Sequence, residues 1–349
     1  MAEKLIKGLA YHGNRMLSHV REDMQDMALS GFNTVLHMFT HNDWDRHRNI
    51  MKEIFAISAD YGLDVWVDNW GLGGPPGDKS HFLAYHPEAH RYGSNGAMEP
   101  VYACYNAPSF VQFSKDWIDT VHEAGAGKIF WDEPHYTDRY ENGQRIWTCR
   151  CECCRKLFYE QYGREMPAEL TEEVDLFRKE SISRYFETVC GYAAAQGMYN
   201  STCVMLPGGE NAPNYGVDLT SICDTPGLHN IGCDPYWLGA YHGYEEVYAY
   251  VYAMTRQNLD ICARHKKDHN IWMQTFSNPP DNDDEIAAAA DAIYDAGGRT
   301  IFAWGYRGSE ANDYRAKAPD RTWYAAKAAF ERITQRHQDQ LRAEARRKV

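Results

Sequence analysis

The strongest constraint on the fold is a repeated alternation, along the chain, between short β-prone segments and amphipathic helical patterns. Several of the β-prone segments are apolar without alternation, which is typical of parallel strands covered on both faces. The eight segments are Ile6–Tyr11, Asn33–Met38, Asp64–Trp70, Lys128–Asp132, Tyr199–Leu206, Asn230–Asp234, Asn270–Phe276 and Thr300–Trp304.

Helical periodicity fills the intervals between these segments. Apolar side chains recur on one face in the sets Val20/Met24/Met27, Ile50/Ile54/Ile57/Tyr61, Phe110/Phe113/Trp117/Val121, Ile286/Ala290/Ile293 and Trp323/Ala326/Phe330/Ile333. The weakest helical pattern lies in 217–225. Eight strand–helix pairs predict an α/β fold, a single-domain (β/α)8 TIM barrel over residues 1–349. An open doubly wound sheet is the rival, but the loop after the first strand, residues 11–15, lacks the glycine-rich dinucleotide fingerprint.

Two predicted loops are long, one after strand three (71–106) and one, rich in cysteine, after strand four. Both belong to the C-terminal side of the barrel, where barrel enzymes build their active sites. The charged tail, residues 335–349, has a helical pattern and is expected to be a solvated end.

Composition limits the partners. The net charge of −13 disfavours nucleic acid. No apolar run approaches the roughly 20 residues that span a bilayer, so no membrane partner is expected. The N-terminal segment MAEKLIKGLA has no signal-peptide pattern, and four of the ten cysteines are crowded together, so we expect a cytoplasmic protein. The sequence leaves open whether the protein forms a homo-oligomer.

Polar and aromatic residues concentrate at the predicted strand ends, which lie on one face of a barrel. Aromatic faces beside carboxylates and amides suit a carbohydrate or oligosaccharide. The predicted substrate-binding residues are Tyr11, His12, His37, Asp68, Trp70, His135, Tyr236, Gln274, Trp304 and Arg307.

The sharpest local motif is Asp132-Glu133-Pro134, at the end of strand four. Breaking a glycosidic bond needs an acid that protonates the leaving oxygen and a second group that attacks or stabilises the ring cation. Glu133 is the predicted acid. The structural alternative is that Asp132 caps the following segment and Glu133 pairs with Arg139.

The motif Phe130-Trp131-Asp132-Glu133-Pro134 resembles the strand-four motif of barrel glycoside hydrolases, in particular the clan of the family 42 β-galactosidases. In that clan the motif reads Asn-Glu-Pro and the Glu is the acid/base. Family 42 also has a structural zinc site, with one Cys after the strand-three loop and a Cys-x-Cys-x-x-Cys cluster after strand four. The resemblance therefore implies a structural zinc and no organic cofactor, with Cys104, Cys149, Cys151 and Cys154 as ligands. Four thiolates fill a tetrahedral shell. Cys153 could replace Cys151 or Cys154, and free thiols are the alternative.

The sequence departs from that clan at two positions. Gln274 stands where the clan has its strand-seven nucleophile Glu, and Asp132 replaces Asn. Three mechanisms remain open. The first is substrate-assisted, because the Asp-Glu pair is similar to that of family 20 and 123 hexosaminidases.

In the second mechanism, which we favour, Asp234 is the catalytic partner of Glu133 or Asp132. A carboxyl separation of about 5–5.5 Å would mean retention and one of about 6.5–9.5 Å inversion. In the third, Asp68 or Glu210 is the partner. Two other functions stay open: a catalytically silent carbohydrate-binding barrel, and a metal-dependent sugar isomerase or lyase that uses His12, His37, His41 and His135.

Overall fold

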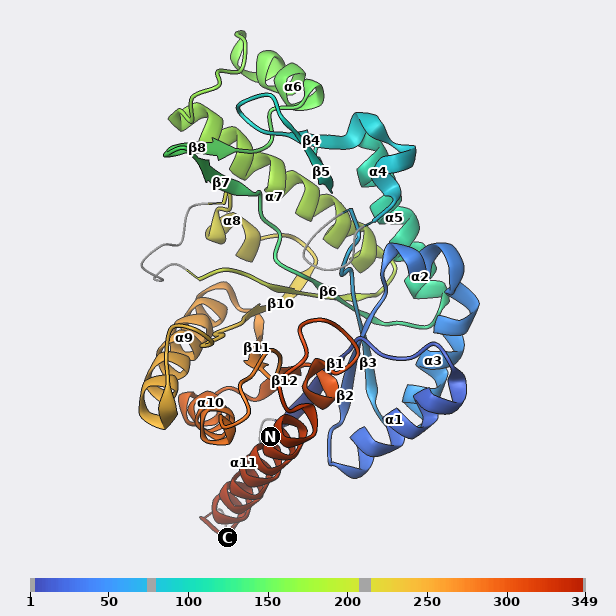
Figure 1. Cartoon of the computed structure of the whole chain (residues 1–349), viewed down its shortest axis with the longest axis vertical. Coiled ribbons are helices and arrows are strands. Elements are labelled where there is room, and N and C mark those ends of the chain that lie inside the picture. The colour runs from blue at the N-terminus through green and yellow to red at the C-terminus, as the bar shows by residue number, and fades with distance from the viewer. Residues whose placement is uncertain (1–3, 74–79, 207–214, 348–349) are drawn as a thin grey trace. The chain divides into compact units, whose positions relative to one another are not determined.

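A closed barrel organises the chain in the computed structural model, which describes residues 4–73, 80–206 and 215–347 (Figure 1). The strand order around the barrel is β1-β12-β11-β10-β9-β6-β3-β2. The predicted (β/α)8 barrel is therefore confirmed. The barrel strands are β1 (Ile6–Tyr11), β2 (Thr34–Met38), β3 (Asp64–Asp68), β6 (Lys128–Trp131), β9 (Tyr199–Cys203), β10 (Leu228–Cys233), β11 (Asp268–Gln274) and β12 (Thr300–Trp304).

All eight predicted strands are present, and the first and last have the predicted bounds. The others differ by a few residues at their ends. The third, for example, ends at Asp68, because the chain turns through Asn69 and Trp70. Parallel pairing places Tyr11 opposite His37 and Gln274 opposite Trp304, so these strands end at the same edge of the sheet.

The chain divides into two compact units. The first comprises Met1–Met38, Lys52–Val67 and Asn230–Val349. Its helices lie against the sheet with the predicted apolar faces buried, for example Val20, Met24 and Met27 of α1. Helices α9 and α10 lie side by side (Figure 1). The elements of this unit outside the barrel are α1 (Leu17–Leu29), most of α3 (Arg48–Asp60), α9 (Gly243–His265), α10 (Asp283–Ala296), η2 (Tyr306–Ser309) and α11 (Pro319–Arg347).

The second unit comprises Phe39–Met51 and Asp68–His229. The weakest predicted helix is present here as the short α8. The long loops predicted after strands three and four contain two antiparallel ribbons, β4–β5 and β7–β8, which the strand-helix alternation did not predict. The elements of this unit outside the barrel are α2 (His41–Arg46), α4 (Phe82–Tyr85), η1 (Pro87–Ala89), β4 (His90–Tyr92), β5 (Met98–Ala103), α5 (Pro108–Glu123), β7 (Asp138–Glu141), β8 (Gln144–Trp147), α6 (Glu152–Tyr162), α7 (Glu172–Ala195) and α8 (Leu219–Cys223).

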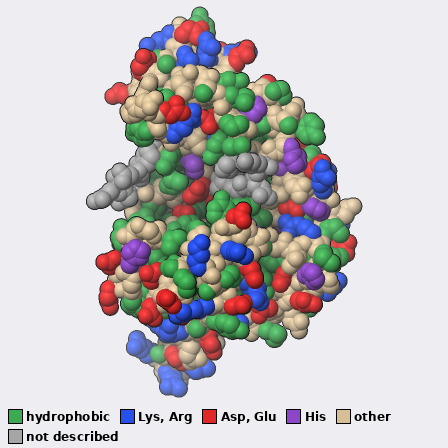
Figure 2. Space-filling model, in the orientation of Figure 1, with side chains coloured by type: hydrophobic (Ala, Val, Ile, Leu, Met, Phe, Trp, Pro, Cys, Tyr) green, Lys and Arg blue, Asp and Glu red, His purple; other side chains and the backbone are tan. Residues whose placement is uncertain are grey.

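The chain ends in the long helix α11. Its last turns are mostly exposed, as expected for a solvated end, and Figure 2 shows Lys and Arg side chains gathered there. Cations at a helix C-terminus interact favourably with the helix dipole. Among the helices of the described segments, none combines the length and the apolar character needed to cross a bilayer.

Candidate functional site

The Asp132-Glu133 pair follows β6 directly, and its backbone is anchored on neighbouring chain segments. The amide of Asp132 donates to Oδ1 of Asn69 at 3.1 Å. Just before it, the indole of the buried Trp131 donates to Oδ1 of Asn200, and the Trp131 carbonyl accepts from the Thr202 hydroxyl. Side chains from two flanking segments therefore fix the point at which the strand ends.

Glu133 has a left-handed backbone, with φ of +35°. A residue with a Cβ atom pays a steric cost in this region, and such strain is concentrated at functional sites. Its carboxylate lies 3.5 Å from Nε2 of His135, and the two side chains are 21% and 17% exposed. Glu133 is therefore held in a strained turn with its carboxylate accessible to solvent.

A small cavity adjoins the pair. Its polar lining includes Asn69, Arg91, Asp132 and Glu133. Its aromatic lining is Tyr105, Phe110, Trp131, Tyr185 and Phe186. The volume of about 40 Å³ has room for water molecules. Water therefore has space beside Asp132 and Glu133.

Two carboxyls near this cavity, the buried Asp68 and the half-buried Asp132, have raised pKa values. Burial raises the pKa of Asp68, which is completely buried, well above its usual range, although a backbone hydrogen bond from Trp70 acts in the opposite direction. Burial also raises the pKa of Asp132, and the charges of Asp68 and Glu133 raise it further. At least one of the two aspartates therefore holds its proton to a higher pH than a free aspartate does.

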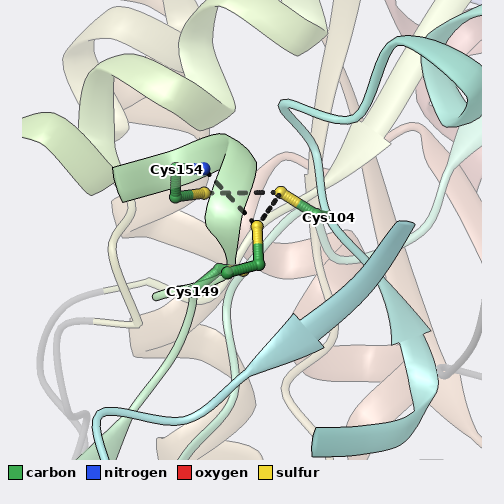
Figure 3. Close-up of side chains that lie close together, drawn as sticks. Cys104, Cys149 and Cys154 are labelled. Carbon is green, nitrogen blue, oxygen red and sulfur yellow. Dashed lines mark hydrogen bonds between the residues drawn. The ribbon is translucent and has the colours of Figure 1, made fainter. Parts of the chain in front are cut away.

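Four buried cysteines meet in the same unit: Cys104, Cys149, Cys151 and Cys154. Their sulfurs lie within 4.8 Å of one another. The sulfur of Cys104 is 3.4 Å from that of Cys154 and 3.5 Å from that of Cys151, and Figure 3 shows Cys104 and Cys154 pointing toward each other. Tetrahedral zinc with bonds of about 2.3 Å separates its sulfurs by about 3.8 Å. The four sulfurs are therefore close enough together to coordinate a single metal ion.

N–H groups donate hydrogen bonds to three of these sulfurs, and such bonds stabilise the negative charge of a thiolate. The amide and the side-chain NH2 of Asn106 donate to the sulfurs of Cys104 and Cys154, at 3.4 and 3.3 Å. The amide of Cys154 donates to the sulfur of Cys151 at 3.5 Å. Cys153 lies outside the group and donates to the Asn106 carbonyl. The residues fit a closed four-thiolate metal site without Cys153.

The four cysteines are the one group of three or more metal-ligating side chains found within residues 4–73, 80–206 and 215–347. The alternative histidine site, built from His12, His37, His41 and His135, is not found there. Glu210, one of the predicted catalytic partners, lies outside the described residues.

In the first unit, four predicted sugar-binding residues come together. Tyr11, His12 and Arg307 line a cavity of about 340 Å³, and the rings of His12 and Trp304 pack in a T-shaped arrangement with centroids 5.1 Å apart. Burial, assisted by the charge of Arg15, lowers the pKa of His12 to about 4, so this imidazole is neutral near pH 7.

Other polar groups in this cavity are already engaged. The Tyr11 hydroxyl donates to Asp23 at 2.6 Å, and burial, followed by this bond, raises the Tyr11 pKa. Arg307 pairs with Glu310 and Asp320. Its charge is therefore compensated within the unit.

Gln274 and His37 are core residues. Gln274 is fully buried, and its carbonyl oxygen accepts from the amides of Trp237 and Leu238, both at 3.1 Å, while its NH2 donates to the Phe276 carbonyl. His37 is also buried, with Nε2 2.9 Å from the Ser58 hydroxyl. In this structure both side chains form hydrogen bonds with other groups of the protein. Their contact with a substrate stays a prediction.

Asp234 follows β10 and is half-buried. Burial, followed by the charge of Asp234, raises the pKa of Tyr250 on α9 to about 12. Tyr236 packs against Phe276 with ring centroids 5.0 Å apart. The catalytic role of Asp234 stays a prediction.

Sequence patterns did not identify Arg91 and Tyr105 as site residues. Both line the cavity beside Glu133. Arg91 belongs to the short strand β4 inside a long loop, where no periodicity marks it. Tyr105 could have been identified from the sequence by its position directly after Cys104, a predicted metal ligand.

Comparisons with known proteins agree on the fold. A GH42 β-galactosidase from G. stearothermophilus is similar with a TM-score of 0.71 at 12% identity, over 97% of this chain and 57% of that one. The catalytic domain of a β-amylase from Paenibacillus polymyxa has a TM-score of 0.65 at 9% identity, over 94% and 99%. A D-allulose 3-epimerase from Methylomonas sp. has a TM-score of 0.50 at 14% identity, over 96% and 100%.

No family model and no curated protein matches the chain. At identities of 9–14%, the structural likenesses show a shared TIM-barrel fold. The chain spans a little over half of the GH42 β-galactosidase. The fold is therefore one that glycosidases and a sugar epimerase use, and the chemistry has to be argued from the site.

Proposed function

We propose that this protein is a glycoside hydrolase in which Glu133 is the general acid. The observation that carries the proposal is the position of Glu133. It lies beside a second carboxyl at the end of a barrel strand, with an aromatic-lined cavity behind it. Its strained backbone and accessible carboxylate suit a group that must reach the leaving oxygen of a bound sugar.

Asp132 is the second carboxyl that this geometry favours. Its pKa is raised toward neutral pH, and a general base is most effective when its pKa is near the pH at which the enzyme works. The water-sized cavity beside it supports a role in holding the attacking water. Asp234 is the competing partner predicted from the sequence.

Three variants test these roles: Glu133→Gln, Asp132→Asn and Asp234→Asn. They are assayed on a panel of aryl glycosides that includes N-acetylhexosaminides. The matched control is Glu141→Gln, an exposed carboxylate on β7 that pairs with Arg139. We expect Glu133→Gln to lose about 10²-fold or more in turnover, the scale of a general acid. Unchanged turnover in Glu133→Gln would refute the assignment.

The two possible partners are separated by the same assay. A large loss in Asp132→Asn with little change in Asp234→Asn supports Asp132, and the reverse supports Asp234. NMR of the first-formed product anomer then distinguishes retention from inversion. A requirement for an N-acetyl group in the substrate would instead support the substrate-assisted mechanism.

We also propose that Cys104, Cys149, Cys151 and Cys154 bind a structural zinc ion. Four sulfurs leave no open coordination position, so the metal would supply rigidity and no reaction chemistry. Cys104 follows the β4–β5 ribbon, whereas the other three follow β8. The ion would therefore fasten two loops of one unit together.

A silent carbohydrate-binding barrel is the second candidate, and Gln274 favours it. A carboxamide is a poor nucleophile, and this one is bonded to backbone groups. Isothermal titration that finds sugar affinity, together with no hydrolysis over days, would support this candidate over the hydrolase.

A further inference from the structure

Arg91 is a buried cation that has no carboxylate partner among the described residues. The residue is 4% exposed. Its guanidinium lies over three tyrosine rings, 4.4 Å from the centroid of Tyr105, 5.0 Å from that of Tyr136 and 5.3 Å from that of Tyr102. Burying a charge is costly unless it is compensated, so these faces and its hydrogen bonds must hold it in place.

The hydrogen bonds of Arg91 go to two backbone carbonyls in different loops. Nε donates to the Ala103 carbonyl at 2.7 Å, and Nη1 donates to the His135 carbonyl at 3.2 Å. Ala103 directly precedes Cys104, and His135 comes two residues after Glu133. A single planar guanidinium therefore joins the loop that presents the cysteine to the loop that presents the acid.

The loop that contains Glu133 is held at several points. The Tyr105 hydroxyl donates to the same His135 carbonyl at 3.1 Å. The Tyr136 amide donates to the Tyr215 carbonyl at 2.8 Å. These contacts surround a left-handed residue, whose strain persists only where neighbouring structure imposes it.

A second buried arginine, Arg178, also connects the loop that contains Glu133 to the segment that contains the cysteines. Arg178 on α7 lies 5.2 Å from the Tyr136 ring and donates to the carbonyl of Thr148, the residue before Cys149. Unlike Arg91, Arg178 forms an ion pair, with Asp138 at 2.6 Å. Arg178 thus has a carboxylate partner of its own, whereas Arg91 contacts the tyrosines and the two carbonyls and lines a cavity together with Asp132 and Glu133.

We propose that Arg91 is a positioning residue that holds the turn of Glu133 in its working conformation through the His135 carbonyl and connects this turn to the four-cysteine group. Arg91 acts on Glu133 through its hydrogen bond to the carbonyl of His135, two residues further along the chain. This inference rests on the proposed hydrolase function for its catalytic consequence, although the structural link can be tested without activity.

The variants are Arg91→Lys, which keeps the charge but loses the forked geometry, Arg91→Met, which loses both, and Tyr105→Phe, which removes the second donor to His135. The matched control is Arg299→Lys. Arg299, in the other unit, also lies over a tyrosine, 4.2 Å from Tyr294, and also donates to backbone carbonyls.

The first readout is hydrogen–deuterium exchange of the peptide over residues 131–136. Its Asp132 and Tyr136 amides are hydrogen-bonded in the intact loop. Exchange should accelerate in both Arg91 variants, less in Tyr105→Phe, and not in Arg299→Lys. If the peptide exchanges in Arg91→Lys as it does in the wild type, the proposal is overturned.

The second readout is kinetic. We expect kcat of Arg91→Lys to fall on the order of 10-fold or more with KM little changed, because the substrate keeps its contacts while the acid is misplaced. Bound zinc should remain. Unchanged kcat with accelerated exchange would overturn the catalytic part of the inference. A third outcome is that the wild type is inactive on every glycoside while the variants show the expected exchange pattern. That result would reject the proposed function but support the structural link between Arg91 and the turn of Glu133.

Discussion

The backbone amide of Asp132 donates to the side-chain oxygen of Asn69, so the end of β6 is fixed by the residue that follows β3. The connection is reinforced by the Asn69 amide, which lies 3.5 Å from the Phe130 carbonyl. Hydrogen bonds of the Asn69 backbone and side chain therefore join the two predicted site segments, at strands three and four, next to the Asp132-Glu133 pair.

Replacing Asn69 by alanine should lower both stability and activity. The Asp132 amide loses its partner, and a hydrogen bond of this kind contributes about 0.5–1.5 kcal/mol to the free energy of unfolding. Urea denaturation and turnover number are the measurements. Asn69→Asp is the control, because a carboxylate oxygen can still accept from the amide. Equal stability of Asn69→Ala and wild type would show that this bond contributes nothing.

Asp68 should make the protein less stable as pH rises. Its folded pKa is raised, so between the unfolded and folded pKa values the folded state binds more protons, and the free energy of unfolding falls with increasing pH. Asp68→Asn removes this effect. We expect the melting temperature of the variant, relative to that of the wild type, to increase as the pH increases from 4 to 8. A constant difference across this range would contradict the raised pKa.

The same variant should change the pH dependence of activity. The charge of Asp68 is one of the causes that raise the pKa of Asp132. In Asp68→Asn the pKa that belongs to Asp132 should therefore move to lower pH in the profile of kcat/KM. An unmoved profile would mean that Asp132 does not titrate in the reaction.

Purified protein should contain tightly bound zinc, measured by elemental mass spectrometry. Cys104→Ser should lose the metal and lower the melting temperature, because one ligand of a closed site is removed. Cys153→Ser should keep the metal, since Cys153 bonds to the Asn106 carbonyl instead. Metal loss in Cys153→Ser with retention in Cys151→Ser would show that the ligand set is different.

Gln274→Ala should destabilise the protein. It leaves the amides of the buried Trp237 and of Leu238 without their acceptor, and an unsatisfied buried amide costs on the order of 1–3 kcal/mol. Gln274→Glu keeps the acceptor but buries a charge and loses the donor to Phe276, so it should destabilise more at pH 8 than at pH 5. Chemical denaturation at both pH values is the measurement. Gain of turnover in Gln274→Glu would instead show that this position can serve as the nucleophile.

The sequence by itself determined the barrel. Apolar β-prone segments such as Ile6–Tyr11 and Thr300–Trp304 and helical faces such as Phe110/Phe113/Trp117/Val121 are local patterns, and local periodicity is enough to predict strands and helices. The placement of Glu133 at a strand end follows from the same patterns. The Cys-x-Cys-x-x-Cys spacing pointed to a metal, while the fourth cysteine came from a family resemblance.

The tertiary structure alone decided which distant residues meet. Arg91 lies 44 positions before His135, and Asn69 lies 63 before Asp132, so no local pattern connects them. Gln274 illustrates the same limit, because no local pattern shows that its side chain is buried and bonded to the amides of Trp237 and Leu238, 37 and 36 positions away. Burial and long-range hydrogen bonding depend on how the loops fold over the barrel. Burial is also the largest cause of the raised pKa of Asp132, to which the charges of Asp68 and of the adjacent Glu133 add.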